Sequence, residues 1–145
     1  MAKVFADTSF LFSLFGNDAH TPRARRWARQ SAEPIAITVL SQYEFGNALR
    51  FASFRKSVPR PDALASLASF QADLRTGFLQ LTSCDLVAVV EEAERMSNRH
   101  TWTGGHRSFD LLHIAAAKML KTATFLTFDS KQRKLAIIEG LLVRP

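Results

Sequence analysis

Four acidic residues occupy positions at which an expected strand ends or a neighbouring helix begins, and they are Asp7, Glu44, Asp110 and Asp129. In an open parallel sheet, the functional crevice lies beyond the carboxyl ends of the strands, so this order would bring the four side chains to one edge. Crowded carboxylates repel one another and raise each other's pKa unless a cation neutralises them. Mg²⁺ and Mn²⁺ prefer such hard oxygen ligands, and a bound ion can activate water for phosphodiester hydrolysis. The four acids therefore predict a divalent-metal site that acts on a phosphate ester.

Each acid also has a purely structural explanation. A carboxylate in the first turn of a helix is stabilised by free N–H groups and the helix dipole, by roughly 0.3–1 kcal/mol. Ser41 and Glu44 have the spacing of a capping box, and Ser108 and Ser130 are expected to cap the helices that follow them. Asp7 is harder to explain in this way, because it directly continues an apolar strand and risks costly burial.

A fifth acid, Asp85, also follows an expected strand. In a sheet that winds outward from the first strand, the third strand lies at the edge, far from the tips of the others. We therefore interpret Asp85 as a helix N-cap and leave it out of the predicted site.

The elements that must position these acids alternate along the chain. Apolar runs rich in strand formers predict strands at 4–6, 35–39, 79–82, 123–127 and 141–143. Amphipathic spacing and capping signals predict helices at 10–15, from 21 onward, and at 41–56, 62–78, 86–99, 110–121 and 130–138, with a loop at 100–107. Strands that alternate with helices require a mostly parallel sheet covered on both faces. We therefore expect an α/β fold of three layers, α/β/α, with about five strands.

Length and charge narrow the class of protein. The 145 residues are the size of one ordinary domain, so a single domain over 1–145 is expected to hold the whole function. The chain contains nineteen Lys and Arg residues and thirteen Asp and Glu residues, which gives a formal net charge of +6. This charge favours polyanionic partners, of which nucleic acid is the first candidate.

Cysteine usage and hydropathy indicate the compartment. Cys84 is the only cysteine, so neither an intrachain disulfide nor a cysteine-based zinc site is possible. No apolar run approaches the roughly 20 residues of a membrane span. We expect a cytoplasmic protein with no membrane partner.

Four segments of the chain resemble, in order and spacing, the acidic segments of PIN-domain ribonucleases. They are Val4-Phe5-Ala6-Asp7-Thr8-Ser9, Ser41-Gln42-Tyr43-Glu44, Arg107-Ser108-Phe109-Asp110-Leu111-Leu112-His113-Ile114-Ala115-Ala116-Ala117 and Phe125-Leu126-Thr127-Phe128-Asp129. The size of the chain and its closing segment 140–143 look like the VapC toxins of type II toxin–antitoxin systems. The resemblance extends over essentially the whole chain and implies a PIN-like fold.

This resemblance implies a metal-dependent endoribonuclease that cuts RNA to arrest translation. It also implies inhibition by a cognate antitoxin of the VapB kind and a homodimeric state. Carried over by position, the catalytic and metal-binding quartet is Asp7, Glu44, Asp110 and Asp129, with Mg²⁺ or Mn²⁺ as cofactor. Asp7 and Asp110 would ligate the ion directly, and the hydroxyls of Ser9 and Thr127 would orient carboxylates or water.

The basic residues and one histidine extend this prediction. Arg107, three residues before Asp110, is the basic residue most expected near an RNA substrate, and Arg23 and Arg26 are further candidates on an arginine-rich helix. A solvated helix face is the competing explanation for the arginines. His113 is interpreted as a helix-packing residue, with contact to the site left open.

Two other functions remain open from the sequence. The chain could be a basic nucleic-acid-binding module without catalysis, or a PIN nuclease that processes RNA without acting as a toxin. Other phosphate-handling enzymes fit less well: Ser9 stands where a haloacid-dehalogenase-type phosphatase needs a second aspartate, and a P-loop and a Gly-x-Ser-x-Gly nucleophile motif are both absent.

Overall fold

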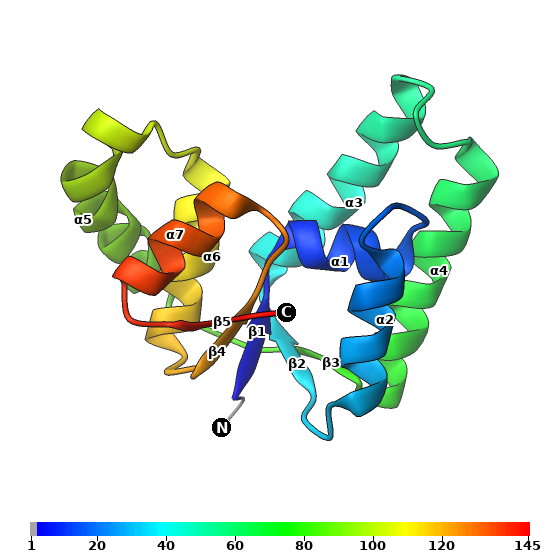
Figure 1. The fold of residues 1–145 in the computed structure, drawn as a ribbon, viewed down its shortest axis with the longest axis horizontal. Coiled ribbons are helices and arrows are strands. Elements are labelled where there is room, and N and C mark those ends of the chain that lie inside the picture. Colours follow the sequence, from blue (N-terminus) through cyan, green and yellow to red (C-terminus); the bar gives the residue numbers. More distant parts are fainter. Residues whose placement is uncertain (1–2) are drawn as a thin grey trace.

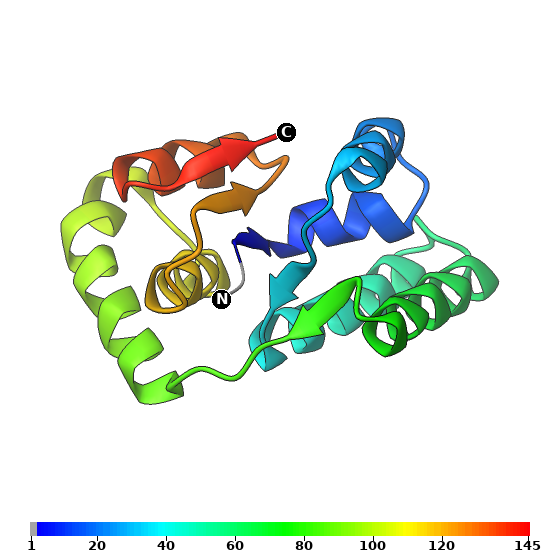
Figure 2. The ribbon, with the colours of Figure 1, turned by 90° about the horizontal axis from the view of Figure 1, so that it is seen from below.

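The computed structural model describes residues 3–145. Five short strands in this range form a single sheet, and every neighbouring pair of strands is parallel. The strands are β1 (Val4–Ala6), β2 (Ile35–Ile37), β3 (Leu79–Leu81), β4 (Thr124–Leu126) and β5 (Leu142–Arg144). Their order is β3-β2-β1-β4-β5, so the chain first winds outward from β1 and then crosses to its other side (Figure 2). The expected parallel five-stranded sheet is confirmed, and β3 lies at the predicted edge.

Helices cover both faces of this sheet. Within residues 3–145 they are α1 (Thr8–Phe15), α2 (Thr21–Gln30), α3 (Val39–Phe54), α4 (Arg60–Thr76), α5 (Leu86–Gly104), α6 (Ser108–Met119) and α7 (Ser130–Ile138). Figure 1 shows α1 to α4 grouped on one side of the strands and α5 to α7 on the other. The expected three-layer architecture is therefore confirmed.

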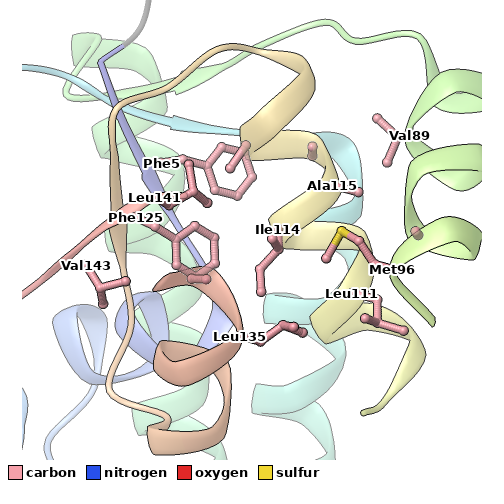
Figure 3. Packing of buried hydrophobic residues seen from close by; sticks show 14 of the residues in the cluster. Phe5, Val89, Met96, Leu111, Ile114, Ala115, Phe125, Leu135, Leu141 and Val143 are labelled. Carbon is pink, nitrogen blue, oxygen red and sulfur yellow. The ribbon is translucent and has the colours of Figure 1, made fainter. Parts of the chain in front are cut away.

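The two faces of the sheet are buried because apolar residues point alternately to each side. Val4 and Ala6 of β1 belong to a core cluster shared with α1 to α4, whereas Phe5 between them belongs to the cluster shared with α5 to α7. Phe5 stacks on Phe125 of β4 with ring centroids 6.0 Å apart (Figure 3). Residues 115–117 of α6 are three alanines, and all are fully buried in this second cluster. Their small side chains allow the helix to pack close to the sheet.

The capping of α3 differs from the expectation. The helix follows Thr38 as N-cap, and the backbone N–H of Thr38 donates to Oγ of Ser41 at 3.2 Å. Ser41 is thus the third helical residue of a box with Thr38, so the predicted box between Ser41 and Glu44 is wrong. The strand before it ends at Ile37, two residues earlier than expected, because Thr38 already begins the turn into the helix. Glu44 consequently has no capping role.

The caps of α6 and α7 also differ. Ser108 and Ser130 are the first residues of these helices, not their caps, and Arg107 and Asp129 occupy the N-cap positions. Asp129 Oδ1 accepts a hydrogen bond of 2.8 Å from the backbone N–H of Gln132. Asp129, and not Ser130, is therefore the cap of α7.

Helix α5 is longer than expected, because residues 100–104 are helical and not part of a loop. His100 lies within 3.1 Å of Glu139 Oε1, a contact that holds the last turns of α5 against the end of α7. The helix ends only at Gly105, whose φ of 63° is the left-handed conformation that glycine adopts readily.

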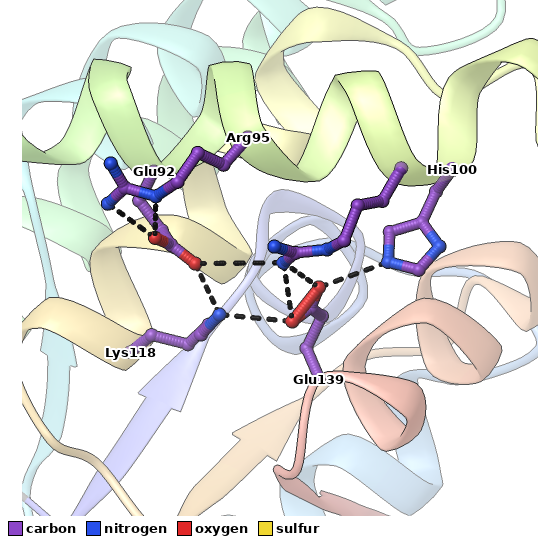
Figure 4. A network of polar contacts seen from close by, with 6 residues as sticks. Glu92, Arg95, His100, Lys118 and Glu139 are labelled. Carbon is purple, nitrogen blue, oxygen red and sulfur yellow. Dashed lines mark hydrogen bonds and ion pairs between the residues drawn. The ribbon is translucent and has the colours of Figure 1, made fainter.

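Two buried glutamates tie α5, α6 and α7 together away from the strand ends. Lys118 of α6 contacts Glu92 of α5 and donates to Glu139 at 3.0 Å (Figure 4). Arg95 and Arg99 complete the network from the surface of α5. These ion pairs satisfy carboxylates that would otherwise be costly to bury.

Within residues 3–145, none of the helices is long and apolar enough to cross a membrane.

Candidate active site

The strand order reverses between β1 and β4, and the crevice at such a switch point is where open α/β sheets bind their ligands. Asp7 follows β1, and Thr127, Phe128 and Asp129 follow β4. The backbone N–H of Asp7 donates to Leu126 O at 3.0 Å, so the two strand ends are held side by side. This pairing brings the first and last predicted acids together.

Asp7 is the most constrained of the four acids, with only 3% of its surface exposed. As N-cap of α1, its Oδ1 accepts hydrogen bonds from the Phe10 N–H at 3.0 Å and from Ser9 Oγ at 2.7 Å. Thr127 Oγ1 donates to Oδ2 at 2.6 Å. Both hydroxyls predicted to orient carboxylates therefore contact the same carboxylate.

Burial raises the pKa of Asp7 to about 6, because desolvation of the carboxylate outweighs the hydrogen bonds from Thr127, Ser9 and Phe10. An acid in this environment pays a free-energy cost to be ionised near neutral pH. A cation at the strand ends would lower that cost.

Glu44 is held by a histidine on a different helix. His113, which is 1% exposed, places Nε2 2.9 Å from Oε1 of Glu44 and 3.3 Å from Oγ1 of Thr8. Burial alone would raise the pKa of Glu44, but the hydrogen bonds with His113 and Thr8 and the electrostatic influence of His113 and Arg107 lower it overall. The interpretation of His113 as a packing residue is thus incomplete, since it is buried in the helix layer and also contacts a candidate catalytic acid.

Asp110 and Asp129 are partly exposed at the mouth of the crevice. Arg107 Nε donates to Asp110 Oδ2 at 3.0 Å, so the arginine predicted to lie near substrate lies against a predicted metal ligand. The side-chain amide of Gln132 donates to the backbone carbonyl of Asp110 at 2.8 Å. The backbone N–H of Gln132 donates to the carboxylate of Asp129. Gln132 therefore fixes the start of α6 relative to the start of α7.

A cavity of about 690 Å³ unites the four acids. Its lining residues include Asp7, Glu44, Asp110 and Asp129 together with Arg107, Asp18 and His20. Across residues 3–145, however, no three His, Cys, Asp or Glu side chains lie close enough to form a ready metal-binding cluster. The four acids surround one space, and Asp110 and Glu44 are each paired with a basic side chain there, Arg107 and His113 respectively.

Not every sequence-predicted residue reaches this cavity. Arg107 lines it, whereas Arg23 and Arg26 lie exposed on α2 and are not among the lining residues. The sequence did not indicate His20 or Asp18 at the cavity, and the contact of His113, which it left open, is present. The helical spacing of three between Asp110 and His113 could have indicated a shared face, but nothing in the sequence marked His20.

The fold is also found in known proteins. A family model described as the PIN domain matches residues 4–138. None of the curated proteins compared matches the chain. VapC20 of Mycobacterium tuberculosis, described as a toxin that cleaves the sarcin-ricin loop, superposes with a TM-score of 0.71 at 19% identity, over 98% of this chain and 99% of that one.

Two further solved structures show the same arrangement of elements. PAE2754 from Pyrobaculum aerophilum has a TM-score of 0.66 at 18% identity, over 98% of this chain and 83% of the other. VapBC2 from Rickettsia felis, solved with a DNA fragment from its promoter, has a TM-score of 0.63 at 15% identity, over 97% and 96% of the two chains. At such identities the likeness establishes a common fold.

Proposed function

We propose that this chain, which belongs to the PIN-domain family, is a metal-dependent endoribonuclease toxin that hydrolyses RNA to inhibit translation. The observation that carries the proposal is that Asp7, Glu44, Asp110 and Asp129 line one cavity at the switch point of the sheet. Arg107 at the same cavity supplies a positive charge for a phosphate. The likeness to a toxin described as cleaving the sarcin-ricin loop supports RNA as the substrate class.

The residues present fit a divalent cation. Oxygen ligands of the carboxylate type suit Mg²⁺ or Mn²⁺. Asp7 is buried with a raised pKa, and Glu44, Asp110 and Asp129 surround the same space. We assign Asp7 and Asp110 as direct ligands, with Glu44 and Asp129 completing the site.

When bound, such an ion supplies a Lewis acid and lowers the pKa of a bound water molecule. The chain's own residues prepare the site for this chemistry. Ser9, Thr127 and the Phe10 N–H fix the orientation of Asp7, so that its carboxylate need not reorganise. Glu44 is ionised at neutral pH because its pKa is lowered, and it can accept a hydrogen bond from water in the cavity.

Arg107 lies where it can meet both a substrate phosphate and Asp110. Its guanidinium pairs with Asp110 at 3.0 Å, and its side chain is largely exposed. An incoming phosphate would offer the guanidinium a bidentate partner. Asp110 would hold the cation through its carboxylate, with Arg107 beside it on the phosphate.

Cleavage of labelled single-stranded RNA by the purified chain tests the proposal. We expect cleavage with Mg²⁺ or Mn²⁺, loss of cleavage in EDTA and a loss of at least a hundredfold in Asp7→Asn. Asp85→Asn is the matched control, because Asp85 is also an N-cap that follows a strand but lies at the distant β3 edge. Equal cleavage by wild type and Asp7→Asn would identify the activity as a contaminant and favour a non-catalytic binding module.

The toxin role and its partner need a separate test. We propose that a VapB-like antitoxin neutralises the chain, an assignment supported by the likeness to the toxin of a VapBC2 complex. Expression of the chain in a bacterium is expected to stop growth, whereas expression of Asp110→Asn is not, and a co-expressed antitoxin restores growth. Active enzyme that leaves growth unchanged would favour a role in RNA processing.

We further propose a cytoplasmic homodimer. Sedimentation velocity of the purified chain, whose mass is 16.2 kDa, measures the state directly. A species of twice that mass supports the dimer, and a monomer at all concentrations contradicts it.

A further inference from the structure

Three aromatic rings form a continuous stack beside the acidic cavity. The imidazole of His20 lies on the ring of Phe128, with centroids 4.6 Å apart and planes 10° from parallel. Phe128 in turn stacks on the buried Phe10 at 5.6 Å, and Trp27 contacts the edge of Phe10. The stack thus runs from the core outward and ends at His20, which is exposed.

The loop between α1 and α2 holds His20 in this place. Asp18 Oδ1 accepts a hydrogen bond of 2.8 Å from the backbone N–H of His20, and its Oδ2 accepts from Ser13 Oγ at 2.9 Å. Thr21 Oγ1 accepts from the Asp18 N–H and donates to the Ser13 carbonyl at 2.7 Å. Asp18 lines the cavity, and both its oxygens accept hydrogen bonds within this loop. The outer ring is positioned before any ligand arrives.

The imidazole of His20 has no part in capping. His20 stands at the N-cap position of α2, yet its side chain makes no capping hydrogen bond. His20 and Phe128 both line the cavity that contains the four acids, and Phe128 precedes Asp129 in the chain. The exposed ring therefore borders the space in which the phosphate would react.

We propose that His20 is a stacking platform for an unpaired base of the RNA substrate next to the cleaved phosphodiester. This inference rests on the proposed function and specifies its substrate class as RNA with a splayed, single-stranded nucleotide. Unpaired bases of RNA stack on aromatic side chains, histidine included, and such stacking tolerates different bases because each has a flat face. Arg107 holds the phosphate while the His20–Phe128 stack receives the base. A loop held rigid in advance lowers the ordering cost of binding.

Binding without cleavage provides the test. A single-stranded RNA oligonucleotide that carries 2-aminopurine at successive positions is titrated with the chain in EDTA, and both anisotropy and quenching are measured. We expect His20→Ala to weaken binding roughly tenfold and to abolish quenching at one position, in line with measured stacking contributions. His20→Trp should restore both signals. The control Trp102→Ala removes an exposed aromatic that does not line the cavity, and it should change neither.

The outcomes separate this inference from the proposed function. Equal affinity and equal quenching for wild type and His20→Ala would overturn it, as would a loss of antitoxin binding in His20→Ala with RNA binding intact. In the cleavage reaction, His20→Ala should raise KM about tenfold and leave kcat within twofold, and an abasic nucleotide at the quenched position should remove that difference. Stacking without any cleavage would contradict the proposed function alone.

Discussion

The hydroxyl of Thr127 donates a hydrogen bond of 2.6 Å to Oδ2 of Asp7, across 120 positions of the sequence. The two residues follow β4 and β1, the neighbouring strands at which the sheet reverses its order. The same Oγ1 accepts the backbone N–H of Asp129 at 3.0 Å. One buried hydroxyl thus links two of the four acids, and the orientation of Asp7 depends on the pairing of β1 with β4.

Replacement of Thr127 by valine tests this link. Thr127→Val keeps the shape of the side chain but leaves Oδ2 of Asp7 and the N–H of Asp129 without their partner. We expect the free energy of unfolding to fall by about 1–3 kcal/mol, the usual cost of an unsatisfied buried group. Urea denaturation measures it. Thr124→Val makes the same chemical change at a half-buried position of β4 and should alter stability by less than about 0.5 kcal/mol. Equal effects of the two changes would remove any special role for the hydroxyl.

Asp7→Asn is expected to stabilise the metal-free protein at neutral pH. The pKa of Asp7 is about 6 in the folded chain against 3.8 in the unfolded one, so the folded state loses stability as the pH rises from 3.8 to 6, where the unfolded chain ionises first. The difference corresponds to about 3 kcal/mol, fully present above pH 6 and absent below pH 3.8. Unfolding in EDTA between pH 4 and pH 8 should show a gap in unfolding free energy between variant and wild type that widens up to about pH 6 and is constant above it. A gap independent of pH would contradict this account of Asp7.

Arg107→Ala is expected to weaken substrate binding with little effect on stability. In its ion pair with Asp110, the Arg107 side chain is exposed to solvent. Such surface pairs contribute about 0–1 kcal/mol to the free energy of unfolding. Loss of a phosphate contact should raise KM and reduce the salt dependence of RNA binding by about one unit of slope. Arg75→Ala, at the exposed end of α4, serves as the control. Unchanged KM and slope would place the substrate phosphate elsewhere.

Lys118→Met is expected to destabilise the fold without affecting cleavage. Lys118 bridges Glu92 and Glu139, whose side chains are both under 10% exposed. Without Lys118, the remaining partners of Glu92 are Arg95 and the more distant Arg99. We therefore expect the free energy of unfolding to fall by about 1–3 kcal/mol. Adding Glu92→Leu to Lys118→Met should recover part of this loss. If the single change leaves the urea midpoint unaltered, the network does not stabilise the packing of α5 on α6.

The sheet was predictable because each strand has its own local pattern. The run Val4–Ala6 is apolar and ends at an acid, and the alternation of runs with amphipathic segments allows few topologies other than a parallel sheet. Helix starts were less predictable. Ser41 fits two capping boxes, one with Glu44 and one with Thr38, and the turn out of β2 favours Thr38. The sequence alone does not determine which of the two capping boxes forms.

The sequence indicated which acidic residues line the site, but not which side chains they contact. Acids at strand ends indicated a shared edge, and all four do line one cavity. The pairing of His113 with Glu44 joins α6 to α3, and the stack of His20 on Phe128 joins a loop to the end of β4. Such contacts depend on how helices pack over the sheet, for which the local sequence carries no signal. The roles of the acids as ligands remain predictions.

The central claim is that Asp7, Glu44, Asp110 and Asp129 act together on one divalent cation. Calorimetric titration of Mn²⁺ into the metal-free chain at pH 7.5 tests it most directly. We expect saturable binding to wild type and to Asp85→Asn, with affinity at least tenfold weaker in Asp7→Asn and in Asp110→Asn. Equal Mn²⁺ affinity in all four proteins would contradict it.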